Sequence, residues 1–174
     1  MPSNIEIKAV LRDRTRVEAI AARLSDTGPE VIHQEDVFFF CEGARLKLRI
    51  LGSDRGELIR YERSNVADAR CSKYEIARTS DPLILLEILT KTLGRVGAVK
   101  KIRTLYLIGQ TRVHLDQVSG LGDFLELEVV LRAEQSEMEG KTVVETLLST
   151  LGIGEQDLIG EAYIDLLARA QSIA

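Results

Sequence analysis

Charged residues alternate with aliphatic ones in two segments that lie far apart in the chain. Glu6 and Lys8 are separated by one isoleucine near the N-terminus, and Glu126 and Glu128 are separated by one leucine. On β-strands, this spacing places the charges of each segment on one face. Carboxylates on one face can hold a divalent cation, and a lysine beside them can contact phosphate. The four residues therefore indicate a site for a metal-bound phosphate.

The length and composition of the chain limit the kinds of protein it can be. Its 174 residues are 45% hydrophobic, so we expect one domain over residues 1–174 with a substantial core. The net charge of -4 argues against nucleic acid as a ligand, because nucleic-acid-binding domains are usually basic. The sequence contains no apolar run of membrane-spanning length and no signal-peptide pattern, and we expect a cytoplasmic protein without a membrane partner. Cys41 and Cys71 lack the CxxC spacing of zinc sites and are interpreted as reduced thiols.

The hydrophobic patterns predict a mixture of strands and helices. Period-two alternation predicts eight strands near residues 3–12, 31–40, 44–51, 56–63, 71–79, 98–109, 111–118 and 124–132. Apolar stripes of helical period predict helices at 15–26, 82–93, 136–151 and 162–170. Ser136 and Glu139 have the spacing of a capping box, and Asp81 before Pro82 is the expected N-cap of another helix. We therefore expect an α+β fold whose helices cover the apolar side of the sheet.

The charged alternation recurs in three further predicted strands. It involves Arg45, Lys47 and Arg49; Lys101 and Arg103; and His114 and Asp116. In an open antiparallel sheet, such a polar face is simply the face toward water. Eight antiparallel strands can instead close into a barrel, and helices packed outside on the aliphatic face then leave the charges pointing inward. Enclosed charges need pairing, water or a charged ligand, which a metal-bound polyphosphate would provide.

Five segments occur in an order that resembles a known family. They are NIEIK at 4–8, QEDVFF at 34–39, ARLKLR at 44–49, KIR at 101–103 and HLDQVSGLGDFLELE at 114–128. Together they resemble the CYTH superfamily, the triphosphate tunnel metalloenzymes, which includes class IV adenylate cyclases and thiamine triphosphatases. The last segment is the most specific, and the resemblance runs nearly end to end. It implies a closed eight-stranded antiparallel β-barrel, a tunnel, with helices packed outside.

The resemblance also implies roles for individual residues. Phosphate contacts are implied for Lys8, Arg45, Lys47, Arg49, Lys101 and Arg103, with Arg63 as a further candidate. Metal ligands for Mg²⁺ or Mn²⁺ are implied at Glu6, Glu126 and Glu128, and the expected catalytic residues are Lys8 and Asp116. The family's E-x-E-x-K strand has Asn4 in place of its first acid here, so that position offers a neutral carbonyl. Tyr163 is expected either to close one mouth of the tunnel or only to pack.

Several functions are compatible with these residues. We favour hydrolysis of inorganic triphosphate, thiamine triphosphate or a nucleotide; the alternative is an adenylate cyclase that forms cyclic AMP and pyrophosphate from ATP. A non-catalytic polyphosphate or nucleotide sensor, in which Glu126 and Glu128 only form ion pairs, is a third possibility, and processing of RNA 5′-triphosphates ranks last because of the acidic net charge. His33 and His114 have no Ser or Cys nucleophile beside them and are interpreted as structural. The Gly120–Gly122 segment links two strands, so no nicotinamide cofactor is expected.

Overall fold

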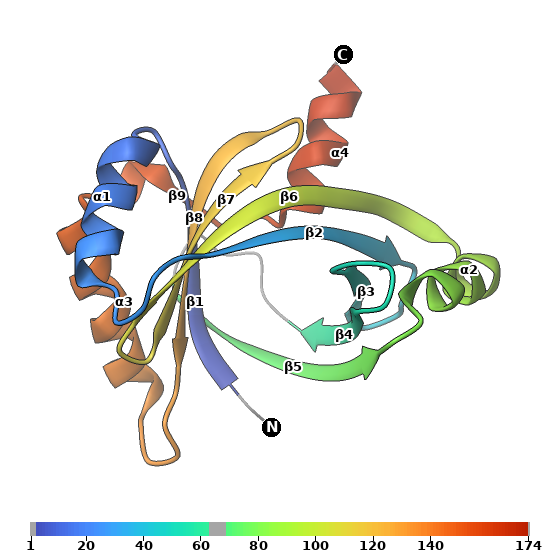
Figure 1. Ribbon diagram of the computed structural model, residues 1–174, viewed down its shortest axis with the longest axis horizontal. Helices are drawn as coiled ribbons and strands as arrows, with labels where there is room; N and C mark the ends of the chain where they lie inside the picture. The colour runs from blue at the N-terminus through green and yellow to red at the C-terminus, as the bar shows by residue number, and fades with distance from the viewer. Residues whose placement is uncertain (1–2, 63–68, 174) are drawn as a thin grey trace.

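The computed structural model describes residues 3–62 and 69–173. In this part of the chain, nine β-strands and four α-helices follow one another as drawn in Figure 1. The strands are β1 (Ser3–Val10), β2 (Glu30–Phe39), β3 (Arg45–Ile50), β4 (Gly56–Glu62), β5 (Arg70–Thr79), β6 (Arg95–Ile108), β7 (Thr111–Val118), β8 (Gly122–Val130) and β9 (Leu158–Ile159). The helices are α1 (Arg14–Leu24), α2 (Pro82–Leu93), α3 (Glu137–Leu151) and α4 (Tyr163–Ile173), with a 3-10 turn η1 (Glu155–Asp157).

The strands form one antiparallel sheet that closes on itself, because β1 pairs with strands from both ends of the strand order. The pairing order is β5-β4-β3-β2-β6-β7-β8-β1-β9, and β1 also pairs with β5. The closing contact is short, because only residues 3–6 of β1 lie opposite residues 70–73 of β5. The first eight strands thus form a ring of pairings around an interior, with the helices outside (Figure 1). The predicted α+β tunnel is confirmed, and β9 and η1 are additions to the predicted elements.

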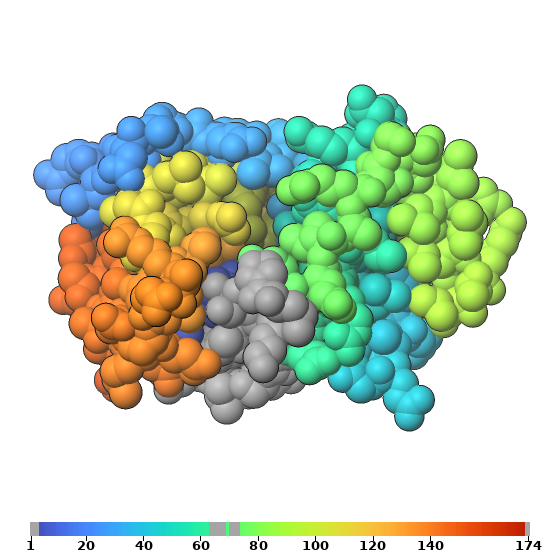
Figure 2. Space-filling view, turned by 90° about the horizontal axis from the view of Figure 1, so that it is seen from below, coloured from blue at the N-terminus to red at the C-terminus, as the bar shows by residue number. Residues whose placement is uncertain are grey.

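The outer face of the ring is apolar and is covered by helices at both ends. Ile5 and Leu127 are buried outward-facing residues of β1 and β8 that pack in one cluster with Val144 and Leu151 of α3 and with Val17 of α1. A second outer cluster lies where α2 covers β2 and β3. Figures 1 and 2 show α1 and α3 at one end of the molecule and α2 at the opposite end. Because apolar and charged residues alternate, this outer burial turns the charged residues toward the interior.

The N-terminus of α3 has the hydrogen bonds that its sequence predicts, whereas the N-terminus of α2 lacks the predicted capping bond. At α3, the Ser136 hydroxyl accepts the backbone N–H of Glu139, and the Glu139 side chain accepts the backbone N–H of Ser136, so the predicted capping box is present. Helix α2 begins at Pro82 as predicted, but the Asp81 side chain makes no capping bond. The Asp81 carboxylate instead accepts a hydrogen bond from the Ser80 hydroxyl at 3.0 Å.

Candidate functional site

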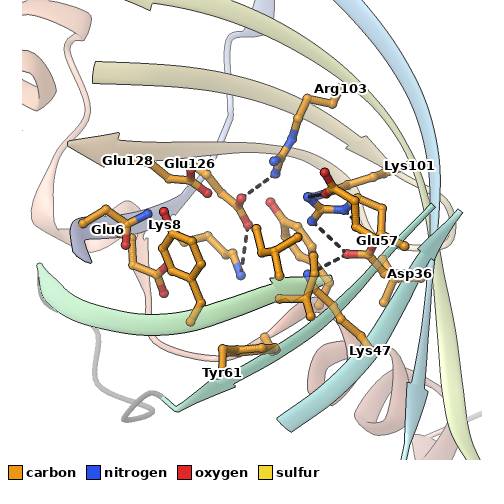
Figure 3. Close-up of a pocket in the computed structure, with 18 of the residues that line it drawn as sticks. Glu6, Lys8, Asp36, Lys47, Glu57, Tyr61, Lys101, Arg103, Glu126 and Glu128 are labelled. Atoms are coloured by element: carbon orange, nitrogen blue, oxygen red, sulfur yellow. Dashed lines mark hydrogen bonds and ion pairs between the residues drawn. The ribbon is translucent and has the colours of Figure 1, made fainter. Parts of the chain in front are cut away.

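The interior of the strand ring contains a cavity of about 700 Å³. Its charged lining comes from alternate residues of the strands, on the face opposite to the two outer apolar clusters. Figure 3 shows side chains that line the cavity. The basic lining residues are Lys8, Lys47, Arg49, Arg78, Lys101, Arg103 and Arg112. The acidic lining residues are Glu6, Asp36, Glu57, Glu126 and Glu128. The cavity is of the size of small-molecule sites and is rich in both signs of charge.

Most of the lining acids gather where β1 pairs with β8. The register places Glu6 opposite Glu128 and Lys8 opposite Glu126, and Figure 3 shows these four side chains on one side of the cavity. One oxygen of Glu126 lies 3.3 Å from Lys8 Nζ, and the other accepts a hydrogen bond from Arg103 at 2.5 Å. Burial raises the pKa of Glu126, but the neighbouring cations outweigh it and hold the pKa well below its usual value. Glu126 is therefore an ionised carboxylate between cations.

His114 on β7 lies next to the same acids. Its Nδ1 is 3.9 Å from Glu126 Oε2 and 3.8 Å from Glu128 Oε1, which is too far for a hydrogen bond. The side chain is buried, and Nδ1 has no hydrogen-bond partner among the described residues. Burial and the charge of Arg103 lower the pKa of His114 more than the nearby carboxylates raise it, so the imidazole is neutral. Sequence reasoning gave this histidine no part in the site, although it lies on the inward face two residues before Asp116.

Asp36 on β2 holds the basic residues of β3. Its carboxylate accepts hydrogen bonds from Lys47 Nζ at 2.7 Å and from Arg49 Nε at 3.0 Å. Burial raises the pKa of Asp36, but the charges of Arg49 and Lys47 outweigh burial and lower it overall. No local sequence pattern indicated this role, because Asp36 is followed by the apolar residues 37–40 and belongs to no alternating charge pattern. An ionised Asp36 therefore fixes both cations at the edge of the cavity.

Asp116 on β7 is the centre of a second buried network. It accepts hydrogen bonds from Lys101 Nζ at 2.7 Å, from Arg103 Nε at 2.7 Å and from the Tyr163 hydroxyl at 3.1 Å. Its side chain is 0% exposed and lies behind the residues that line the cavity. This placement suits a residue that orients Lys101 and Arg103. The expectation that Asp116 is a catalytic residue stays a prediction.

The network around Asp116 gives the folded protein a definite response to acid. Burial raises the pKa of Asp116, but the charges of Arg103 and Lys101 outweigh burial and lower the pKa from 3.8 to about 2. Between these values the unfolded chain binds the proton and the folded chain does not, so stability falls as the pH drops through this window. We expect a loss of about 2 kcal/mol of unfolding free energy from this group between pH 5 and pH 2. Urea unfolding at several pH values measures it, and a midpoint that stays constant from pH 5 to pH 2 would contradict it.

Tyr163 at the start of α4 lies beneath two of the lysines. Lys8 Nζ is 3.9 Å from the centroid of its ring and Lys101 Nζ is 4.9 Å from it, both within cation–π range. The ring also contacts Phe124 at a centroid distance of 5.0 Å. Burial raises the pKa of Tyr163 well above its usual value, so the phenol stays protonated and its hydroxyl donates a hydrogen bond to Asp116. Tyr163 packs against Phe124 and also lines the cavity, and its closing of one tunnel mouth stays a prediction.

Arg45, which was singled out in the sequence, is not part of the cavity lining that the structure describes. Its guanidinium lies 2.8 Å from Asp165 on α4. Arg63 lies outside the described residues. Conversely, Arg112 was missed, although extending the alternation of His114 and Asp116 back by two residues would have found it.

The acidic side of the cavity has the donor set of a divalent-cation site. Glu6, Glu126 and Glu128 supply the hard oxygens that Mg²⁺ and Mn²⁺ prefer. Asn4 also lines the cavity, and its Oδ1 is buried without a hydrogen-bond partner among the described residues. A buried polar atom without a partner is costly, and a cation would satisfy it. The residues present therefore fit the metal that the resemblance implies.

Comparison with known proteins gives a consistent result. The family model described as the CYTH domain matches residues 3–163. The adenylate cyclase CyaB of Aeromonas hydrophila is 26% identical over 182 residues, which cover 97% of this chain and 91% of that protein. The PH1012 protein of Pyrococcus horikoshii superposes with a TM-score of 0.82 at 23% identity, over 94% of this chain and 98% of the other. HpAC1 of Hippeastrum, described as having a dominant triphosphatase activity, gives a TM-score of 0.63 at 17% identity, over 97% and 96% of the two chains. Among the described helices, none has the length and apolar character needed to span a membrane.

Proposed function

Because the chain belongs to the CYTH domain family, we propose that it is an enzyme that binds a triphosphate in its cavity and hydrolyses a phosphoanhydride bond with Mg²⁺ or Mn²⁺. The family includes adenylate cyclases and triphosphatases that use divalent metals. The observation that carries the proposal is the two-sided lining of the cavity. Carboxylates on β1 and β8 face basic residues on β3 and β6. A triphosphate with a bound cation carries the charges that complement both sides.

The basic side binds and orients the phosphates. Arg49 and Arg103 offer planar donor groups that can clamp two phosphate oxygens, and Lys47 and Lys101 add compact positive charges. Their counter-ions, Asp36 and Asp116, hold these side chains in place before a ligand arrives. Donors that are already fixed need little reorganisation as negative charge develops on the phosphoryl group, which is the main electrostatic contribution to such a reaction.

The acidic side would hold the metal through Glu6, Glu126 and Glu128. When bound, a divalent cation there neutralises phosphate oxygens and lowers the pKa of a coordinated water. Lys8 lies between this side and Tyr163, so its ammonium group can stabilise charge on the departing phosphate. In hydrolysis, water attacks the terminal phosphorus atom and the bond from this phosphorus to the bridging oxygen breaks. The products are inorganic phosphate and a substrate with one phosphate group fewer.

Cyclisation of ATP is the second candidate, and a separate part of the lining favours it. Phe38, Ile59, Tyr61, Tyr74 and Ile76 give the cavity an apolar and aromatic region beside the charged one. Such a region can stack a base or another organic group. In this reaction the ribose 3′-hydroxyl attacks the α-phosphate and pyrophosphate leaves. The name of the Aeromonas relative agrees with this alternative.

The decisive experiment is product analysis with three substrates. Purified protein is incubated with ATP, thiamine triphosphate or inorganic triphosphate, each with Mg²⁺ or Mn²⁺, and the Glu126→Gln variant is run in parallel. Release of free phosphate supports the triphosphatase. Cyclic AMP together with pyrophosphate would replace that proposal by the cyclase, and tight binding without either product would replace it by a non-catalytic sensor.

Removal of Lys47 tests the basic side of the site. We expect Lys47→Ala to weaken the binding of inorganic triphosphate roughly tenfold or more, because a charge-assisted hydrogen bond contributes about 1.5 to 3 kcal/mol. Isothermal titration calorimetry measures the Kd. Lys100→Ala is the matched control, since Lys100 is an exposed lysine on β6 whose side chain is 67% exposed and lies 3.9 Å from Glu35. Equal affinities of the two variants would place Lys47 outside the binding surface.

A further inference from the structure

His114 and two acids of β8 lie in the geometry of an ion-binding site. Glu126 and Glu128 each direct an oxygen toward His114 Nδ1, at 3.9 and 3.8 Å. His114 is 4% exposed, and its Nδ1 has no hydrogen-bond partner among the described residues. A buried nitrogen between two carboxylates at these separations makes neither a hydrogen bond nor a close packing contact.

The separations are those of atoms that share a metal ion. One ring nitrogen of His114 and one oxygen of each glutamate all lie within 4.8 Å of one another. A small dication keeps its ligands at roughly 2.0 to 2.2 Å, so ligand atoms on one ion are separated by up to about 4.4 Å. The two measured nitrogen–oxygen distances fall within that limit. The cross-strand register explains the arrangement, because His114 on β7 is directly opposite Glu126 on β8.

We propose that His114 Nδ1 is a metal ligand together with Glu126 and Glu128, and that this nitrogen makes the site prefer first-row transition-metal dications over Mg²⁺. The proposal rests on the proposed function only for the place of the metal beside the phosphates. It goes beyond that function by adding a nitrogen ligand to the three acids and by naming the class of ion.

The preference follows from the chemistry of the donor atoms. Mg²⁺ takes oxygen ligands and binds few protein groups, whereas imidazole suits transition-metal ions. For a given site with nitrogen and oxygen donors, affinity rises from Mn²⁺ through Fe²⁺ and Co²⁺ to Ni²⁺. His114 therefore adds affinity for these ions and little for Mg²⁺. Glu6, on the neighbouring strand opposite Glu128, remains as an oxygen donor for either kind of ion.

The chain allows a clean test because it contains only two histidines. His33 is the other one, and it is an exposed residue of β2. We would bind Mn²⁺ to untagged protein without substrate and record the pulsed electron paramagnetic resonance signal for modulation by a coordinated nitrogen. The samples are the natural sequence, His33→Gln, His114→Gln, and His33→Gln protein in which histidine alone carries ¹⁵N. Titration of free Mn²⁺, with and without competing Mg²⁺, gives the two affinities.

We expect a nitrogen modulation that persists in His33→Gln, takes the ¹⁵N pattern when histidine is labelled, and disappears in His114→Gln. The Kd for Mn²⁺ should rise roughly tenfold or more in His114→Gln, since even outer partners of metal ligands contribute 10- to 100-fold to affinity. The Kd for Mg²⁺ should change much less. If His114→Gln fails to fold, the labelled His33→Gln sample decides alone, because His114 is then its only histidine.

Three results would overturn the proposal: bound Mn²⁺ without nitrogen modulation in the natural sequence, modulation that survives in His114→Gln, or no specific binding of Mn²⁺. Failure of this inference is distinct from failure of the proposed function. Turnover that depends on Glu126, without a nitrogen signal, would contradict only the proposal that His114 is a metal ligand. A clear nitrogen signal without turnover of any triphosphate would contradict the proposed enzymatic function and support the metal site.

Discussion

Glu126→Gln is expected to reduce metal-dependent turnover by about 100-fold or more, because even an outer partner of a metal ligand contributes 10- to 100-fold. Glu126 lies on the acidic side of the cavity and also balances the charges of Lys8 and Arg103. The amide has nearly the same shape as the carboxylate but lacks its charge. Steady-state rates with Mg²⁺ and with Mn²⁺, on whichever triphosphate is turned over, measure the effect.

The controls for this variant separate chemistry from folding. Glu145→Gln makes the same chemical change at an exposed position on α3, far from the cavity lining, and should leave the rate unchanged. Thermal unfolding of Glu126→Gln shows whether the fold survives the loss of one counter-charge. Full activity in a folded Glu126→Gln protein would contradict the proposal that Glu126 is a metal ligand.

Asp116→Asn is expected to lower the free energy of unfolding by about 3 to 5 kcal/mol, the usual cost of removing one partner from a buried ion pair. Asp116 is fully buried and is the shared acceptor of Lys101, Arg103 and Tyr163. Its replacement by a neutral amide leaves the buried cations Lys101 and Arg103 without the negative charge that balances them. Urea unfolding at pH 7 measures the change.

Asp123→Asn provides the matched comparison for Asp116→Asn. Asp123 pairs with Arg14 at 3.1 Å, but its side chain is 32% exposed, and such surface pairs contribute about 0 to 1 kcal/mol. Similar losses for the two variants would mean that burial does not set the importance of Asp116. The Asp116→Asn protein should also lose part of the acid sensitivity of the natural sequence, because the carboxyl group with the lowered pKa is gone.

Sequence pattern predicted much of the fold because period-two alternation and apolar helical stripes act locally. The strands that contain Glu6, Lys47, Lys101 and Glu126 were all identified, and their charges do line one cavity. Alternation alone, however, is compatible with both an open sheet and a closed ring. The closure depends on the pairing of β1 with β5, a long-range contact that no local pattern encodes, and it was predicted only through the family resemblance.

The site was less predictable because several of its side chains act through partners that are distant in the chain. Asp36 stands next to apolar residues, and its function depends on Lys47 and Arg49 across the β2–β3 pairing. His114 has no other histidine near it in the sequence, and only the register with β8 brings it to the acids. Arg45 follows the alternation of its strand but lies where α4 approaches and pairs with Asp165 instead.

The position of β1 has a consequence for the order in which the protein is made. Its partners are β5, β8 and β9, and the Lys8 ammonium group donates to the carbonyl oxygen of Glu161 at 3.2 Å. During synthesis the first strand leaves the ribosome long before these partners exist, and an unpaired strand is a site for wrong association. The cavity is completed only when both ends of the chain have met. We therefore expect folding on the millisecond-to-second scale of proteins dominated by non-local pairing.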